Sequence, residues 1–207
     1  MSAKPHLIVK WLLLFVLFDS SAVAEYRDAV GWYELVEELG AETPDGTGIK
    51  VSLIESAVIR NYLPDRSNFD FIGKTFTVMS GDSGHSNHAT VVGQRLFGNT
   101  MSMAGGIDQI DLYESVDWLL DGFLQVGQPL FPAIETSRIQ NHSWAGSFDE
   151  DEFNVEAMRR LDYAIERDRF VAVVALRNDI FAVPPLLAHA YNAITVGRPS
   201  GEHSRGG

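Results

Sequence analysis

Short apolar runs rich in β-branched residues are the clearest pattern in this 207-residue chain, and they predict buried strands. Phe170 to Leu176 (FVAVVAL) is the strongest run, and Ile49 to Ile54 (IKVSLI) is the first strong one. Weaker runs of the same kind predict further strands over residues 75–79, 107–113, 138–144 and 193–196.

Apolar residues also recur at helical spacing, which predicts helices between these strands. The predicted helices cover residues 31–39, 88–97, 116–126 and 152–167, and Gly40 and Gly98 are placed to end the first two. Because strands and helices alternate, the chain is expected to be an α/β protein, a three-layer sandwich with a mostly parallel central sheet. Ligands of such sheets bind at the carboxyl ends of the strands.

The N-terminal segment has a different pattern, typical of a secretory signal peptide over residues 1–24. Lys4 and Lys10 are positive, Trp11 to Phe18 is apolar, and Ala22-Val23-Ala24 gives a small-x-small cleavage site. An uncleaved anchor helix is the alternative, although the run is short for a membrane span. We therefore expect a secreted or periplasmic protein that does not contact the membrane after signal cleavage.

Composition narrows the functions that the chain can have. Its 16 basic and 28 acidic side chains give a net charge of −12. Because nucleic-acid-binding proteins usually carry a basic stripe, we do not expect this chain to bind nucleic acid. The absence of cysteine excludes disulfides, cysteine-ligated zinc and a thiol nucleophile within this sequence.

Three polar side chains stand at predicted strand ends or helix starts and match the accessories of acyl transfer. Glu55 follows the first strong strand, His88 begins a helix, and Asn178 follows the strongest strand. A carboxylate can orient an imidazole, which then removes a proton from a hydroxyl nucleophile, and an amide N–H can stabilise the oxyanion. Each residue taken alone is more often an ordinary loop, cap or turn residue.

Five segments, in order, resemble motifs of the subtilisin-like serine peptidases, and the similarity covers residues 46–207. Carboxylate before histidine is also the chain order of subtilisin. The similar segments are Lys50 to Ser56 (KVSLIES), His88 to Gly93 (HATVVG), Asn141 to Gly146 (NHSWAG), Val171 to Asn178 (VAVVALRN) and Tyr191 to Gly197 (YNAITVG).

The resemblance implies a serine-type endopeptidase that acts on a polypeptide. His88 would be the general base, Glu55 its orienting carboxylate and Asn178 the oxyanion donor. Ser143, Trp144 and Ala145 would line the substrate, with Trp144 either a specificity determinant or a packed aromatic. In this interpretation residues 25–45 form an N-terminal helix and linker, and residues 46–207 form part of a peptidase domain.

The sequence departs from the family pattern at two important places. Glu55 replaces the family's aspartate, and Ala57 replaces a glycine. The nucleophile motif, expected on the order of 150 residues after the histidine, is missing, and neither Ser200 nor Ser204 lies in such a motif. We therefore expect a sheet that is incomplete at its C-terminal side and a chain that is inactive alone.

Two other functions remain open at this stage. One is a metal site built from Asp82, His85 and His88, with His142 or His189 as a further ligand. The other is a non-catalytic module that binds peptides or a partner protein. The sequence predicts no cofactor, and a structural calcium site cannot be read from it.

Overall fold

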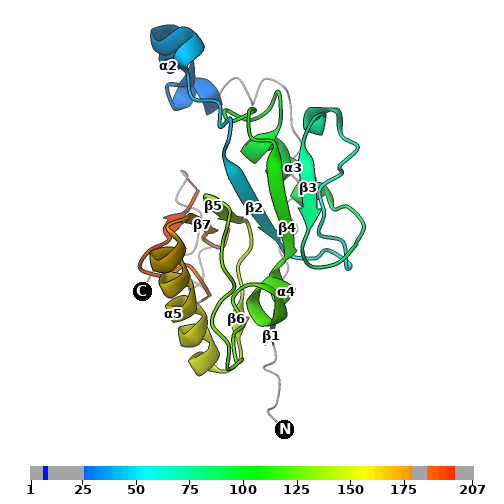
Figure 1. Ribbon diagram of the computed structural model, residues 1–207, viewed down its shortest axis with the longest axis vertical. Coiled ribbons are helices and arrows are strands. Elements are labelled where there is room, and N and C mark those ends of the chain that lie inside the picture. The colour runs from blue at the N-terminus through cyan, green and yellow to red at the C-terminus, as the bar shows by residue number, and fades with distance from the viewer. Residues whose placement is uncertain (1–6, 9–25, 179–185, 199–207) are drawn as a thin grey trace.

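The computed structural model describes residues 7–8, 26–178 and 186–198 and contains a six-stranded parallel sheet (Figure 1). Its strands lie in the order β3-β4-β2-β5-β7-β8, and each neighbouring pair is parallel. The predicted α/β fold with a parallel central sheet is confirmed. The strands are β2 (Lys50–Glu55), β3 (Thr75–Val78), β4 (Gln109–Glu114), β5 (Ile139–His142), β7 (Val171–Ala175) and β8 (Ile194–Val196).

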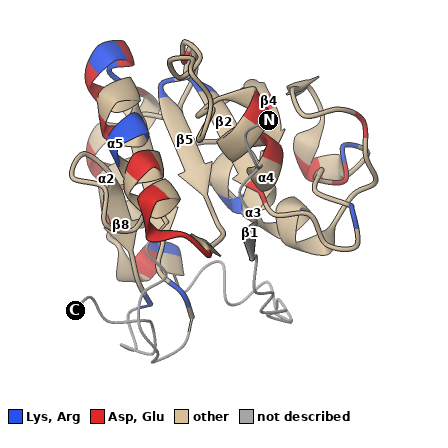
Figure 2. Ribbon diagram, turned by 90° about the horizontal axis from the view of Figure 1, so that it is seen from below, with Lys and Arg blue, Asp and Glu red and all other residues tan. Residues whose placement is uncertain are grey.

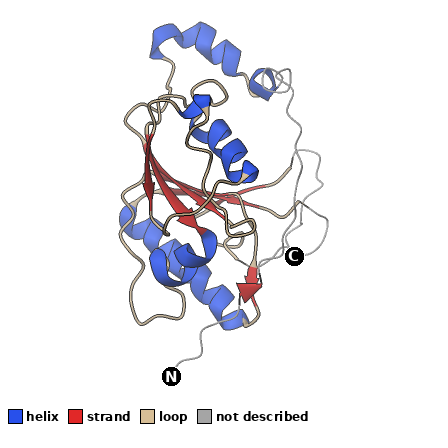
Figure 3. Ribbon diagram, turned by 90° about the vertical axis from the view of Figure 1, so that its right-hand side faces the viewer, coloured by secondary structure: helices blue, strands red, loops and turns tan. Residues whose placement is uncertain are grey.

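Helices cover both faces of this sheet, so that the strands lie between two helical layers (Figure 3). On one side lies α3 (Asn87–Phe97), and on the other lie α4 (Ser115–Asp117) and α5 (Asp151–Asp168). Basic and acidic residues are interspersed along α5 (Figure 2). Glu156 pairs with Arg160 within the helix, and Glu166 pairs with Arg169 just past its end. A small antiparallel pair joins β1 (Leu7–Ile8) to β6 (Ser147–Phe148).

The core consists of two apolar clusters, one on each face of the sheet, and β2 contributes to both. Val51 and Leu53 belong to the cluster beneath α3, with Phe71, Phe97 and Leu112, whereas Ile54 belongs to the cluster beneath α5. Side chains of a strand alternate between the two faces. The nearly continuous apolar run of β2 therefore reflects burial on both sides.

The predicted helix over residues 116–126 is shorter in the structure than in the prediction. It begins as α4, where the Glu114 carboxylate accepts hydrogen bonds from the backbone N–H groups of Val116 and Asp117, both at 2.9 Å. It continues as a π-turn, η3 (Trp118–Gly122), and the chain then reverses near Gln125, whose φ is 57°. Trp118 and Leu119 are fully buried, so packing against the sheet, rather than helical periodicity, places their side chains.

The N-terminal helix α2 (Trp32–Leu39) contributes no buried residue and extends away from the sheet (Figure 1). A short 3₁₀ turn follows it (Gly40–Glu42). Tyr26 contacts the body of the protein, because its hydroxyl donates to the Met101 carbonyl at 2.7 Å. The predicted signal peptide, apart from residues 7–8, lies outside the described residues. No helix in the described ranges has the length and apolar character needed to cross a membrane.

Candidate active site

A carboxylate and an imidazole meet at the carboxyl end of β2. Glu55 is the last residue of that strand, and its Oε2 atom lies 2.6 Å from Nδ1 of His88, near the start of α3. The Glu55 side chain is only 1% exposed, whereas the His88 side chain is 46% exposed. One partner is therefore held inside the protein while the other faces solvent.

Strand alternation and helix capping bring these two residues together. Glu55 lies on the same face of β2 as Val51 and Leu53, which is the face that α3 covers. The hydroxyl of Ser86 accepts a hydrogen bond from the Ala89 N–H at 3.0 Å and so caps α3. The backbone before the cap is held as well, because Ser86 N donates to the Leu63 carbonyl at 2.9 Å.

Burial and hydrogen bonding shift the pKa values of both groups upward. For Glu55, removal from water raises the pKa of the carboxyl, and the hydrogen bond from His88 opposes this rise. For His88, the hydrogen bond to Glu55 raises the pKa of the imidazole, and partial desolvation opposes it. Since the carboxylate accepts from Nδ1–H, the outward Nε2 atom of a neutral His88 is free to take a proton.

The other predicted site residues lie at the same edge of the sheet. Asn178 is exposed just after β7, two strands from β2 and thus on the order of 10 Å away. Ser143 and Ala145 follow the intervening strand β5 and are half-buried, and Ser143 Oγ accepts from Asn141 Nδ2 at 2.8 Å. Trp144 is only 6% exposed and belongs to the core, which fits the packed aromatic of the two roles considered for it.

Sequence reasoning missed a buried polar network on the opposite face of the sheet. Ser137 N donates to Glu135 Oε1 at 2.6 Å, Gln140 Nε2 donates to Glu135 Oε2, and Gln140 Oε1 accepts from His142 Nε2 at 3.2 Å. Ser52, whose hydroxyl donates to Ser137 Oγ at 2.9 Å, completes the network. A serine within the apolar run of β2 was the one signal that could have revealed it.

The alternative of a metal site gains no support from this arrangement. His142 pairs in register with Ile54, so its side chain lies on the face opposite Glu55 and His88. Asp82 instead approaches Arg66, with Oδ1 3.7 Å from the guanidinium. Within residues 7–8, 26–178 and 186–198, no three His, Asp or Glu side chains come together as metal ligands would.

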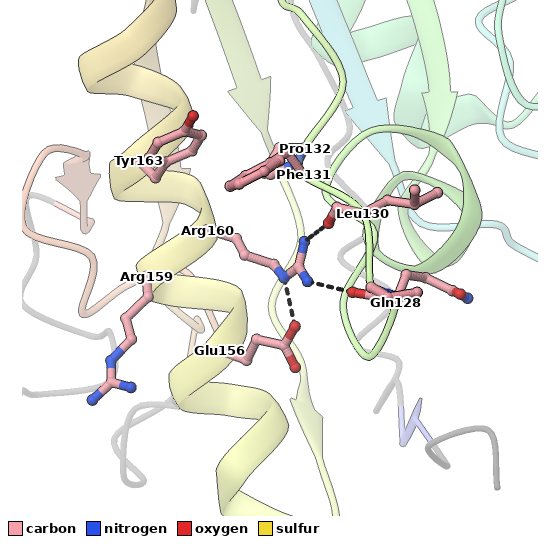
Figure 4. Close-up of a pocket in the computed structure, with 9 residues that line it drawn as sticks. Gln128, Leu130, Phe131, Pro132, Glu156, Arg159, Arg160 and Tyr163 are labelled. Carbon is pink, nitrogen blue, oxygen red and sulfur yellow. Dashed lines mark hydrogen bonds and ion pairs between the residues drawn. The ribbon is translucent and has the colours of Figure 1, made fainter. Parts of the chain in front are cut away.

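An open hollow of about 420 Å³ lies on the α5 side of the molecule (Figure 4). Arg160 crosses it and donates to the carbonyls of Leu130 at 2.6 Å and Gln128 at 2.7 Å, while Glu156 accepts from the same guanidinium. The predicted site residues do not line it. Its own polar groups are largely occupied in holding the 128–132 loop to α5.

The chain was compared with family models, curated proteins and solved structures. No family model and no curated protein matches the chain. A solved structure described as the prenylagaramide maturation protease PagA matches with a TM-score of 0.57 and 16% sequence identity. The match covers 83% of this chain and 63% of PagA, so the chain spans less than two thirds of that protein. At this identity the similarity shows a shared fold.

These findings correct the family assignment suggested by the five motifs. The assignment to the subtilisin-like serine peptidases is wrong by these comparisons, since no family model matches and the structural neighbour is described as a maturation protease. The physical reason is that a strand running into a polar residue, or a histidine at a helix start, is common to many parallel α/β folds. The comparisons therefore support only a shared fold between this chain and a protease.

Proposed function

We propose that this chain carries the acid–base part of a peptidase site and that its substrate is a polypeptide. The observation that carries the proposal is the 2.6 Å contact between buried Glu55 and exposed His88 at the carboxyl end of β2. A buried carboxylate fixes the tautomer of the imidazole and leaves Nε2 available as a general base. The shared fold with the protease PagA supports peptide hydrolysis as the reaction.

In the proposed reaction, His88 Nε2 removes the proton of a hydroxyl nucleophile as its oxygen attacks the peptide carbonyl carbon. The carbonyl π electrons move onto oxygen, and in this proposal the exposed Asn178 amide donates a hydrogen bond to that oxygen. His88 then passes the proton to the leaving amine, the C–N bond breaks as the carbonyl re-forms, and an ester joins the substrate acyl group to the nucleophile oxygen. Water, deprotonated by His88 in the same way, attacks this ester, and the proton returns to the nucleophile oxygen as the carboxyl product leaves. In the described part of the chain, no hydroxyl is hydrogen-bonded to His88, so the identity of the nucleophile belongs to the test.

The substrate would run along the 143–145 segment between the two halves of the site. This segment follows β5, which lies between β2 and β7, and therefore separates Glu55 from Asn178. Ser143 and Ala145 are the accessible members, whereas Trp144 supports the segment from below. The proposed reaction needs no cofactor.

The test combines hydrolysis with chemical labelling. The full secreted protein, as wild type and with His88→Ala, is incubated with a peptide library, and new termini are identified by mass spectrometry. A fluorophosphonate probe, which reacts with activated serine hydroxyls, is added in parallel. Cleavage and labelling by the wild type, both lost in His88→Ala, support the proposal, whereas equal cleavage by the two proteins refutes the role of His88.

A second candidate function, a non-catalytic peptide-binding module, is favoured by a separate observation. Glu55 Oε1 is buried without a hydrogen-bond partner among the described residues, although carboxylates that orient a catalytic histidine are usually well satisfied. This function predicts peptides retained by the immobilised protein, with no new termini and no labelling. The same experiment therefore distinguishes the two functions.

We also propose that the protein acts after export, because residues 1–24 have the pattern of a signal peptide. Sequencing the N-terminus of the mature protein tests this proposal. A mature chain that begins at Glu25 supports export, and an intact Met1 in the exported fraction contradicts cleavage.

A further inference from the structure

A tight hairpin next to the Glu55–His88 pair has a backbone conformation that its residues disfavour. Val58 and Asn61 exchange two backbone hydrogen bonds, at 2.8 and 2.9 Å, around the two-residue tip Ile59-Arg60. Both tip residues have positive φ, 49° for Ile59 and 74° for Arg60. Such turns strongly prefer Asn-Gly, and a β-branched residue at positive φ is an outlier.

The strain at this tip is not offset by packing. The other described non-glycine residues with positive φ have a structural reason for it. Gln125 stands at a chain reversal, where Gln128 N donates to its carbonyl at 3.1 Å, Arg169 caps α5, and Leu187 is buried with 1% exposure. Ile59, in contrast, is 90% exposed and contributes nothing to either core cluster. Unfavourable backbone conformations without a packing role concentrate at functional sites.

The hairpin is fastened to the loop that leads to His88. Ser83 Oγ donates to the Arg60 carbonyl at 2.5 Å, and Leu63 N donates to the Gly84 carbonyl at 3.3 Å. Asn61 lies directly over Gly84, where an added Cβ would stand 2.6 Å from Asn61 Oδ1. The tip is thus held rigidly relative to the imidazole rather than left free in solvent.

Distance along the chain places the tip within reach of a substrate at His88. Ile59 is four residues after Glu55, so their Cα atoms are at most about 14 Å apart. An extended peptide covers that distance in about four residues. A polypeptide reacting at His88 can therefore pack a nearby side chain against Ile59.

Resting on the proposed function, we propose that Ile59 is a specificity-determining residue that selects polypeptides by an apolar side chain within about four residues of the reacting bond. The hairpin holds the Ile59 side chain outward before substrate arrives, so little rotational freedom is lost on binding. Recognition, rather than folding, then accounts for an isoleucine at a position that favours asparagine.

The key variant replaces the tip with the preferred turn residues, Ile59→Asn together with Arg60→Gly. Because Asn-Gly suits positive φ at both positions, this variant should unfold about 3–6 °C higher than the wild type. It should also lose about tenfold in kcat/KM on the best library peptides, and its preference for an apolar residue should disappear. A merely structural tip predicts the gain in stability without the loss of selectivity.

Arg169→Gly is the matched control, since it relieves positive φ at the α5 cap and lies outside the proposed site. It should raise the unfolding temperature by about 2–4 °C and leave the cleavage profile unchanged. An identical loss of selectivity in Arg169→Gly would mean that added stability, not the missing isoleucine, lowers activity, and would overturn the proposal.

Peptide binding by His88→Ala, with and without the tip replacement, separates this proposal from the proposed function. If the wild type cleaves peptides but the tip variant shows the same profile and affinity, the role of Ile59 is refuted and the peptidase function stands. If the wild type cleaves nothing, the peptidase function fails. The role of Ile59 is still supported if His88→Ala enriches apolar peptides and the tip replacement abolishes this enrichment. If His88→Ala does not enrich apolar peptides, the role of Ile59 is refuted.

Discussion

Two histidines at the same end of the sheet illustrate how surroundings decide chemistry. His88 is partly exposed and hydrogen-bonded to a buried carboxylate, so its pKa is raised. His142 is 1% exposed, pairs with the amide of Gln140 and packs edge-on to Trp118 at 4.7 Å between ring centroids. Burial lowers the pKa of His142 to about 3.

The comparison separates His88, which we propose to act as a general base, from His142, which is buried in the core. Gln140 Nε2 donates to Glu135, so Gln140 Oε1 must accept from His142 Nε2–H, and the ring is fixed as a neutral tautomer. His88 has an acceptor on its inner nitrogen and solvent on its outer one. The type of partner and access to water, not the imidazole itself, therefore distinguish their roles.

The largest effect is expected from His88→Ala. Removing the proposed general base should lower peptide hydrolysis by about 10⁴-fold, because no other described side chain is hydrogen-bonded to Glu55 in its place. The unfolding temperature should fall by a few degrees, because the 1% exposed Glu55 carboxylate loses the hydrogen bond from His88. Steady-state kinetics and thermal unfolding measure the two effects. Hydrolysis that persists in this variant would remove His88 from the mechanism.

Glu55→Gln should come next, with about a 10²–10⁴-fold loss of activity, because an amide stabilises the imidazolium far less than a carboxylate does. The pH–rate profile is the sharper measurement. In the wild type, activity should rise with pH through an inflection above about 6.5, the ordinary histidine value, because His88 acts when deprotonated. In Glu55→Gln this inflection should move to lower pH. An unmoved inflection would disconnect the two residues.

The same variant tests the cost of burying Glu55. The pKa values of Glu55 and His88 are both raised in the folded protein, so the folded state holds these protons more tightly than the unfolded chain. Their contribution to stability is therefore greatest below the unfolded pKa values, about 4.3 and 6.5, and falls as pH rises through the folded ones. Glu55→Gln should unfold at higher temperature than the wild type at pH 8, with the gap closing near pH 4.

His142→Ala should show the opposite pattern to His88→Ala. It should lower the free energy of unfolding by about 2–4 kcal/mol through the cavity left beside Trp118 and Trp144. His142→Phe keeps a ring but leaves Gln140 Oε1 unsatisfied, at a cost of about 1–3 kcal/mol. The free energy of unfolding in urea, measured for both variants, separates the contribution of packing from that of the hydrogen bond. Wild-type stability in both would show that the buried network is dispensable.

The smallest effect is expected in the wild-type protein itself, as a difference between the titration of His88 and that of His142. The ring signals of His88 should titrate above about 6.5, whereas those of His142 should stay constant down to about pH 4. NMR spectra of the histidine rings across this range measure both. If His142 titrates near 6.5, water reaches it and the contrast between the two faces is lost.

Much of the fold follows from local pattern. The apolar runs at 49–54 and 170–176 became β2 and β7, and the amphipathic run at 152–167 became α5, each within two residues of its predicted ends. The helix over 116–126 was overpredicted, because its apolar residues pack on the sheet through a π-turn and a chain reversal. Periodicity indicates which residues are buried, but it does not distinguish a regular helix from a π-turn and chain reversal that bury the same residues.

The candidate site was predicted in outline only. The positions of Glu55 and His88 at a strand end and a helix start suggested that they meet, and they do. Their pKa shifts, the core position of Trp144 and the Glu135–Gln140–His142 network were not predictable, because each depends on neighbours distant in sequence. The strained Ile59-Arg60 tip carries no turn-forming residue at all, so its conformation is invisible in the sequence.

By itself, the sequence determined the order of strands and helices, the burial of β2 on both faces and the absence of cysteine from these 207 residues. These properties depend on backbone periodicity and residue type, which act locally. Only the tertiary structure decided which histidine faces water, which carboxylate is removed from water, and that the Ile59-Arg60 hairpin is strained. Those outcomes depend on distance and desolvation, which arise when remote segments pack together.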